Sequence, residues 1–269
     1  MGSSNGFSGV SKKNVSGSTC FKRSTMRGGS FATGCSGTTR SARIRRWAIE
    51  VRFNTGRNNQ LRWLDFRGAL QPGGGTNLFH SFGDFSVPTN NIANFLNSGS
   101  VDLAGSLLGS GLPTSNILAR VTGGNPSSIF GMIQTNGVGG FGNANLFLMN
   151  PAGVIFGPTA TLNVGGMATF TTADYLRLAD GARFNAMPHV RAHALLSTAP
   201  VAAFGFLGSN PGAIAVQGSH LSVTEGMSIS LIGGNITIQN GTLDNGTVGS
   251  GQAANLTAPA GQINLASVA

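Results

Sequence analysis

The stretch Asn143–Gly166 reads NANLFLMNPAGVIFGPTATLNVGG. It contains two short apolar runs, Leu146–Met149 and Val154–Phe156, which are joined by Asn150-Pro151-Ala152-Gly153. That tetrapeptide suits a type I β-turn, because Asn is favoured at its first position, Pro at its second and Gly at its fourth. A second breaker, Gly157-Pro158, follows. The stretch therefore predicts strand, tight turn, strand, turn and strand, with no room for a helix.

The composition extends this prediction to the rest of the chain. Of 269 residues, 42 are Gly, 40% are hydrophobic and only 9% are charged. Short apolar groups separated by Gly, Asn and Thr are typical of all-β proteins with many turns. No run of about 18 or more apolar residues exists, so we expect no transmembrane helix.

A regular interval in the C-terminal third predicts how the strands are arranged. Ile214 and Ile236 are 22 residues apart, as are Leu221 and Leu243, and Leu243 precedes Ile263 by 20. With three short strands per interval, this is the period of a solenoid whose strands stack in parallel. We therefore expect a parallel β-helix with coils of about 20–22 residues. A β-sandwich is the structural alternative, but it does not need a regular interval.

One segment departs from this regular pattern of short apolar strands. Tyr175–Phe184 alternates apolar and polar residues around Asp180-Gly181, which favours a hairpin or the corner of a coil. No Gly occurs from Phe184 to Phe204, so we expect a loop or an excursion from the regular body there.

The positive charge of the chain is concentrated at its start. The formal net charge is +9, but residues 1–68 carry 13 Lys and Arg against two acids, whereas residues 69–269 carry four Arg against six acids. This contrast predicts a domain boundary near residue 69. We interpret residues 1–68 as a basic, disordered or non-native N-terminal segment that adds little to stability. Its alternating run Ile44–Phe53 is a possible strand.

Two other functions are conceivable for this basic segment. Its arginines, with Trp47 and Trp63, would suit a nucleic-acid tail, although basic tails are common and we expect no nucleic acid. Cys20 and Cys35 would form a disulfide in an oxidising compartment, or remain free thiols without a role. Residues 1–70 contain no apolar stretch of the about 7–15 residues that a secretory signal needs.

A second motif, NLFHSFGDFSVP, occupies Asn77–Pro88. His80 invites a metal or catalytic role, but no His, Cys or carboxylate lies at ligand spacing around it, so a structural His is favoured. Phe79, Phe82 and Phe85 are assigned to hydrophobic packing rather than to a binding surface.

Taken in order, the motifs resemble the secretion domain of two-partner-secretion exoproteins, the group that includes filamentous haemagglutinin. The resemblance covers about residues 73–269 and rests on NLFHSF, RVTGG, NLFLMNPAGVIFG, LNVGG, NPGAIAVQG and GQINLASVA. This chain departs from the family at Ala152, where Asn is usual. Residues 1–68 resemble neither a signal peptide nor the strand-rich segment that precedes NLFHSF in the family.

The resemblance implies a right-handed parallel β-helix with an N-terminal cap. It also implies export by the Sec machinery to the periplasm and recognition by an outer-membrane transporter, a β-barrel with periplasmic recognition domains. The product would be a monomeric exoprotein of adhesin or haemagglutinin type, secreted or held at the surface of a Gram-negative bacterium. Residues 69–269 contain no cysteine, so no disulfide locks a loop before passage through a pore.

The residues assigned to secretion and partner recognition fall in the two motifs and are Asn77, Leu78, Phe79, His80, Ser81, Phe82, Asn150, Pro151 and Gly153. The short amide of Asn150 can bond its own turn and, between coils, a neighbouring coil. Gly153 is expected where a Cβ would obstruct the backbone. The alternative is that both motifs only support folding.

An enzyme is the rival function class, because parallel β-helices also include polysaccharide lyases and hydrolases. Such enzymes need carboxylates close together. The six acids of residues 69–269 are dispersed, and Glu225 and Asp244, 19 apart, only approach the coil interval. His189 and His193 have a helical metal-ligand spacing but no acidic third ligand. We expect no catalysis, cofactor or metal; a carbohydrate-binding or adhesive module remains an alternative.

Overall fold

Three short strands follow one another between Asn145 and Asn163, and the chain then returns to lie beside the first of them. This course repeats along the chain in the computed structural model, which describes residues 49–53, 64–72, 75–97, 113–187, 196–242 and 251–268. All of these residues fall within one unit, residues 42–269, and every regular element among them is a strand.

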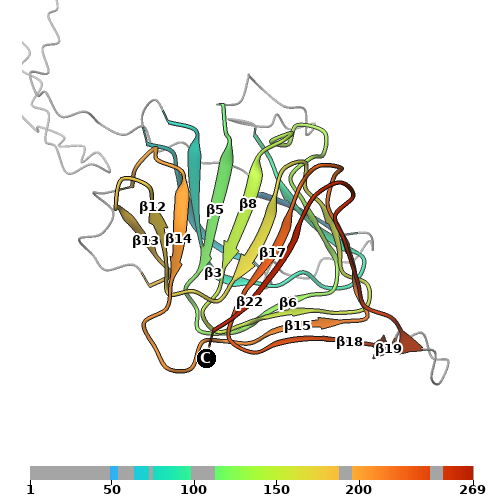
Figure 1. Cartoon of the computed structure of the whole chain (residues 1–269). Helices are drawn as coiled ribbons and strands as arrows, with labels where there is room; N and C mark the ends of the chain where they lie inside the picture. The colour runs from blue at the N-terminus through green and yellow to red at the C-terminus, as the bar shows by residue number, and fades with distance from the viewer. Residues whose placement is uncertain are drawn as a thin grey trace, which may run out of the picture. The chain divides into compact units, whose positions relative to one another are not determined.

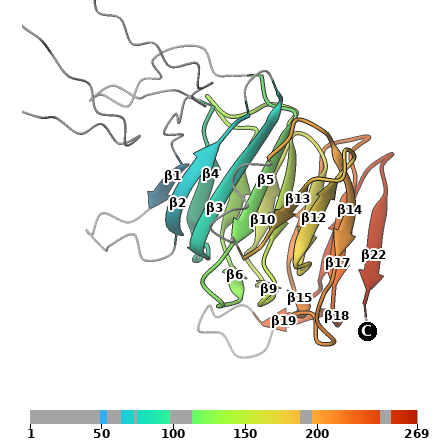
Figure 2. The same ribbon diagram turned by 90° about the vertical axis from the view of Figure 1, so that its left-hand side faces the viewer.

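One seven-stranded sheet runs the length of this unit, in the spatial order β2-β3-β5-β8-β11-β17-β22 (Figure 2). From β3 onward all neighbours pair in parallel, whereas β2 pairs with β3 antiparallel. The strands are β2 (Leu64–Leu70), β3 (Asn77–Phe85), β5 (Asn116–Val121), β8 (Asn145–Met149), β11 (Ala168–Thr171), β17 (Ile229–Gly233) and β22 (Ile263–Ser267).

Two further sets of strands complete the coils. A parallel four-stranded sheet contains β6 (Ser127–Ile129), β9 (Val154–Phe156), β15 (Ile214–Gln217) and β18 (Ile236–Gln239). Another four-stranded sheet contains β1 (Ile49–Phe53), β4 (Asn91–Phe95), β7 (Met132–Gln134) and β10 (Thr161–Asn163), with β1 antiparallel to β4. A separate parallel pair consists of β16 (His220–Ser222) and β21 (Asn255–Thr257). The molecule is therefore a parallel β-helix, as predicted (Figure 1).

The predicted interval of 22 residues is present, although not in every coil. Leu146 pairs with Ala168, and Ile214 pairs with Ile236, each 22 residues further on. The proposed step from Leu221 to Leu243 is wrong, because Leu221 pairs with Leu256. A hairpin of β19 (Gly241–Thr242) and β20 (Gly251–Gln252) lengthens this coil; Leu243 itself lies outside the described residues.

The segment around Asp180-Gly181 leaves the helix as an excursion. It forms a three-stranded antiparallel sheet, β13-β12-β14, which we call the excursion sheet. Its strands are β12 (Tyr175–Leu178), β13 (Arg183–Asn185) and β14 (Val201–Gly205). Asp180-Gly181 makes the hairpin between β12 and β13, which was one of its two expected roles.

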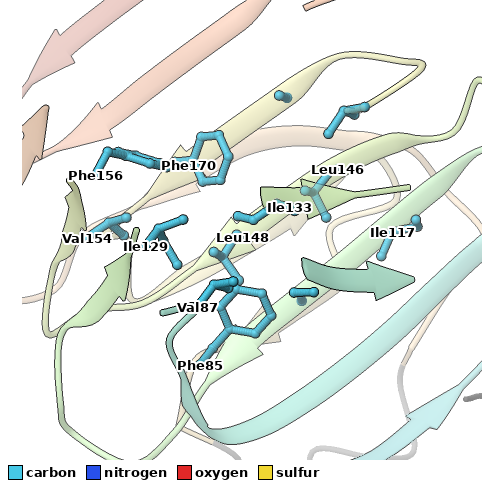
Figure 3. Packing of buried hydrophobic residues seen from close by; sticks show 14 of the residues in the cluster. Phe85, Val87, Ile117, Ile129, Ile133, Leu146, Leu148, Val154, Phe156 and Phe170 are labelled. Carbon is cyan, nitrogen blue, oxygen red and sulfur yellow. The ribbon is translucent and has the colours of Figure 1, made fainter. Parts of the chain in front are cut away.

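The main core lies inside the coils. Alternate residues of the parallel strands point inward, since successive side chains of a strand face opposite sides. Figure 3 shows Leu146 of the seven-stranded sheet near Ile133 of β7, and Val154 of β9 near Ile129 of β6; all four belong to this core. At the C-terminal end of the described residues, Ile263 and Leu265 occupy the same inward rows but are 45% and 50% exposed.

A second core covers the outer face of the seven-stranded sheet. Phe79, Leu118, Phe147 and Met149 point outward from β3, β5 and β8 and are nevertheless buried. They pack against apolar residues of the excursion sheet, which are Leu176, Leu178, Phe184 and Phe204. The excursion therefore explains why these strands are apolar on both faces, as strands covered on both sides generally are.

The N-terminal quarter corrects one expectation. Residues 1–68 were interpreted as disordered or non-native, with the run Ile44–Phe53 as a possible strand; Ile49–Phe53 within that run does form a strand, and Leu64–Gly68 belongs to another that was not expected. Their pairing satisfies the backbone groups along the free edges of β4 and β3, which would otherwise be exposed edge strands. The boundary at residue 69 stays a prediction. Cys20, Cys35, Trp47 and Trp63 lie outside the described residues.

Candidate functional site: the buried secretion motifs

The residues assigned to secretion lie at two places in the fold. Asn77–Phe82 forms most of β3, and Asn150–Gly153 is the turn between β8 and β9. Ser81 and Pro151 are half-buried. The others are buried: at most 3% of the surface is exposed in Asn77, Leu78, Phe79, His80, Phe82 and Asn150, and Gly153 is also buried. A partner cannot reach these side chains in the folded domain.

The first motif is divided between the two cores. Leu78 and Phe82 point into the coil, whereas Phe79 points outward, with its ring centroid 5.0 Å from that of Phe184 in the excursion sheet. Phe82 packs edge-on against Phe85 at 5.0 Å and Phe95 at 6.4 Å. The assignment of these phenylalanines to packing is therefore confirmed.

Asn77 begins a ladder of three amides that sequence reasoning missed. Asn116 Nδ2 donates to Asn77 Oδ1 at 2.8 Å, and Asn145 Nδ2 donates to Asn116 Oδ1 at 2.9 Å. The backbone N–H of Met167 then donates to Asn145 Oδ1. At the other end, Asn77 Nδ2 donates to the carbonyls of Ser197 and Ala199. The ladder joins successive coils and ties the residues before β14 to β3. The only sign of this ladder in the sequence is an Asn at the start of each of three strands. That these asparagines lie side by side follows only from the register in which the strands pair.

Arg120 is a second missed residue, and it explains Ser81. The two are paired in register, and Arg120 Nε donates to Ser81 Oγ at 2.7 Å. Arg120 Nη1 donates to the carbonyl of Asn185, and its Cζ lies 4.8 Å from the ring centroid of Phe184. Burial lowers the pKa of this arginine to about 10. Arg120 thus fastens the excursion sheet to β3 and β5.

His80 is a core residue rather than a ligand. Its ring centroid lies 5.5 Å from that of Phe95 and 6.1 Å from that of Phe82. Desolvation by burial lowers the pKa of His80 to about 3, because the charged imidazolium is disfavoured in an apolar interior. The side chain is therefore neutral at the pH of most compartments.

Acidification is expected to destabilise the domain through His80. In the unfolded chain a histidine has a pKa near 6.5. Between about 6.5 and 3 the unfolded chain binds more protons, so the free energy of unfolding falls as pH drops through this window and the full contribution is present above it. At pH 5 the loss is about 2 kcal/mol. Urea unfolding at pH 7.5 and pH 5.0 measures it.

The control for this prediction is the exposed His220. The variant His80→Leu should lose most of the pH dependence between 7.5 and 5.0, whereas His220→Gln should retain it. An unchanged pH dependence in His80→Leu would show that another group is responsible.

Asn150 makes the contacts that its sequence context predicted. Its Oδ1 accepts from the backbone N–H of Ala152 at 3.0 Å, within its own turn. Its Nδ2 donates to the carbonyl of Asn125 and to Ser127 Oγ, both at 2.9 Å, in the preceding coil. The Gly153 N–H donates to the Asn150 carbonyl, which closes the β-turn. One buried amide thus fixes this corner and attaches it to its neighbour.

Gly153 has the backbone that its position requires. Its φ is +124°, a region that other residues rarely adopt, and an added Cβ would lie 3.0 Å from the carbonyl oxygen of Ala213 in the next coil. The corner therefore disfavours a side chain on both grounds.

Replacing Asn150 by alanine is expected to lower the free energy of unfolding by about 2–3 kcal/mol, since each buried polar group left without a partner costs about 1–3 kcal/mol. Ser127 Oγ and the N–H of Ala152 would lose their partner. Urea unfolding of Asn150→Ala beside Asn235→Ala, an exposed asparagine, measures it. Equal stability of the two variants would contradict the structural role.

Other residues considered from the sequence do not gather into a site. Among the described residues, no group of three or more His, Cys, Asp and Glu is placed to hold a metal ion. His189, His193, Asp102 and Asp244 lie outside that part of the chain. The described residues also contain no helix long and apolar enough to span a membrane.

A solenoid whose motif residues join successive coils is a repeat scaffold. The family model described as the TPS secretion domain matches residues 63–269. The chain therefore belongs to the TPS secretion domain family, and the resemblance read from its motifs is confirmed. The match begins at residue 63, just before β2.

Comparison with solved structures gave a further similarity. The crystal structure of the filamentous hemagglutinin secretion domain is 17% identical to this chain, with a TM-score of 0.33, and the match covers 76% of this chain and all of the other. A search of curated proteins gave no match.

Proposed function

We propose that this domain directs the export of a two-partner-secretion exoprotein. In this proposal the Sec machinery delivers the chain to the periplasm, and the recognition domains of an outer-membrane transporter bind it there. The chain then folds as a monomeric β-helix outside the cell, where its exoprotein has an adhesive role and no catalytic one. Membership of the TPS secretion domain family over residues 63–269 carries the proposal.

The burial of the motif residues supports recognition before folding. Asn77, His80, Phe82 and Asn150 are all at most 1% exposed in the folded domain. A transporter that contacts these side chains must therefore contact an extended or partly folded chain. A role in folding alone would give the same burial, and the variants described below separate the two roles.

The order of the coils supports folding that proceeds from the N-terminal end. β3 and β4 are paired on one side with the antiparallel strands β2 and β1, and on the other side with the parallel strands β5 and β7. The capped first coil can thus serve as the template on which each later coil adds its strands. Residues 69–269 contain no cysteine, so this process needs no disulfide formation.

Binding to the purified recognition domains of the cognate transporter tests the proposal. The chain is presented unfolded in urea and diluted into the binding assay, and separately as the folded domain. We expect binding of the unfolded chain and at least tenfold weaker binding of the folded one. Equal affinity for both, or no binding of either, would contradict the proposal.

Variants then separate recognition from folding. Asn77→Ala, Asn150→Ala and Gly153→Ala are compared with the exposed control Asn235→Ala. Weaker binding of the unfolded variants assigns the motif residues to recognition. Unchanged binding combined with lower stability assigns them to folding alone, and would remove them from the recognition site.

A further inference from the structure

The excursion sheet, which Figure 2 shows as β13, β12 and β14, carries two exposed arginines at directly opposed positions. Arg177 on β12 pairs with Arg183 on β13 in antiparallel register, and both side chains are exposed. Residues opposed in this way have Cβ atoms about 4.5–5.5 Å apart, and like charges there are destabilising. An anion between the two guanidinium groups would remove this repulsion.

An aromatic ring holds one of the two arginines. The Cζ of Arg183 lies 4.4 Å from the ring centroid of Tyr175 on β12. The ring lies over Gly205 of β14, where an added Cβ would come within 1.9 Å of the ring Cζ, so only glycine leaves room for it. A guanidinium stacked in this way loses less conformational freedom when it binds a ligand. Arg177 is flanked on β14 by the small, exposed Ala203.

The charges around this pair do not neutralise it. Asp180, in the turn between β12 and β13, accepts from the Ala182 N–H and from the Ser197 side chain. Asp174 accepts from the Leu207 N–H. Within the described residues, neither arginine is joined to a carboxylate by an ion pair, so both guanidinium groups remain available to a ligand.

The pair is also distinctive within the β-helix. Residues 69–269 contain only four basic residues, of which Arg120 is buried and Arg191 lies outside the described residues. The two others are Arg177 and Arg183. The exposed basic side chains of this part of the chain, so far as it is described, are thus gathered on one small sheet.

We propose that the face formed by Tyr175, Arg177, Arg183 and Ala203 binds an oxyanion, a carboxylate or a phosphate group, through both guanidinium groups. The planar fork of arginine matches two oxygens of such a group. The ligand class is an anionic saccharide or a phosphate ester. This site is independent of the export function, because it needs an exposed face of the folded domain rather than the buried motifs.

The single tyrosine of the chain makes the proposal directly testable. Tyr175 is the only Tyr, so 3-fluorotyrosine labelling of the full chain places one fluorine NMR signal at the site. The probes are trigalacturonate for a carboxylate, pyrophosphate for a phosphate, and maltotriose as the neutral control, at about 0.15 M salt to screen distant charges. We expect a saturable shift with at least one anion and none with maltotriose. The anion that causes the shift shows whether the site binds a carboxylate or a phosphate. The absence of a saturable shift with either anion would overturn the proposal.

A matched charge control excludes general attraction to the basic segment. Arg177→Gln/Arg183→Gln and Arg45→Gln/Arg46→Gln each remove two positive charges. The first should weaken anion binding at least tenfold, and the second should leave it unchanged. Equal weakening in both would overturn the proposal. Arg177→Lys/Arg183→Lys keeps both positive charges but lacks the planar guanidinium groups. If the glutamine variant does not fold, weaker anion binding by this lysine variant is the second readout.

Discussion

Removal of residues 1–70 is expected to destabilise the β-helix by on the order of 5 kcal/mol, whereas removal of residues 1–48 leaves its thermal midpoint nearly unchanged. Ten residue pairs join β1 to β4 and β2 to β3, and a strand hydrogen bond contributes about 0.5–1.5 kcal/mol net. Their loss also opens the edge of the first coil to pairing with other chains. Thermal and urea unfolding of both truncated chains measure the difference.

The geometry of β2 gives this prediction its reason. β2 runs antiparallel to β3 and has two register irregularities, between Leu64 and Phe66 and between Phe66 and Gly68. An irregular antiparallel strand ends a parallel series, because its outer edge is a poor template for another strand. A midpoint that is the same for both truncations would show that β1 and β2 do not act as a cap.

Replacing Phe82 by alanine is expected to lower the free energy of unfolding by about 3–5 kcal/mol, the usual cost of emptying a buried phenylalanine site. Phe82 is fully buried and contacts the rings of Phe85 and Phe95, so the cavity would lie within the first coil. Since later coils stack on this one, the loss should affect the whole unit rather than one end.

Two control variants test whether the destabilisation by Phe82→Ala arises from the emptied core site. Phe82→Leu retains most of the volume and should cost clearly less than Phe82→Ala. Val138→Ala alters a side chain that is 94% exposed and should be nearly neutral. A small effect of Phe82→Ala, within the range of the Val138 variant, would contradict the assignment of Phe82 to the core.

The sequence predicted the features that depend on local chemistry. Asn150-Pro151-Ala152-Gly153 has residue types that suit only a few turns, and the structure contains that turn with the predicted amide contacts. The step from Ile214 to Ile236 likewise predicted a coil, because unbroken rungs repeat their apolar residues at a fixed interval.

Features that depend on distant partners could not be predicted in this way. The predicted interval from Leu221 to Leu243 was wrong because the inserted β19–β20 hairpin lengthens this coil. The hairpin does not change the sequence pattern of short apolar groups, so the pattern could not reveal it. The ladder from Asn77 to Asn145 and the role of Arg120 require the pairing register, which no single segment specifies. The alternating run Ile44–Phe53 indicated β1 as a possible strand, but β2 was hidden by a basic composition, since backbone pairing with β3 places little demand on residue type.

The export function is tested most directly in cells. The chain is given a Sec signal peptide, followed after residue 269 by a reporter protein, and is produced in a Gram-negative host with and without the cognate outer-membrane transporter. We expect the reporter to reach the medium only when the transporter is present and to remain in the periplasm when it is absent. Equal amounts of reporter in the medium under both conditions would contradict the account.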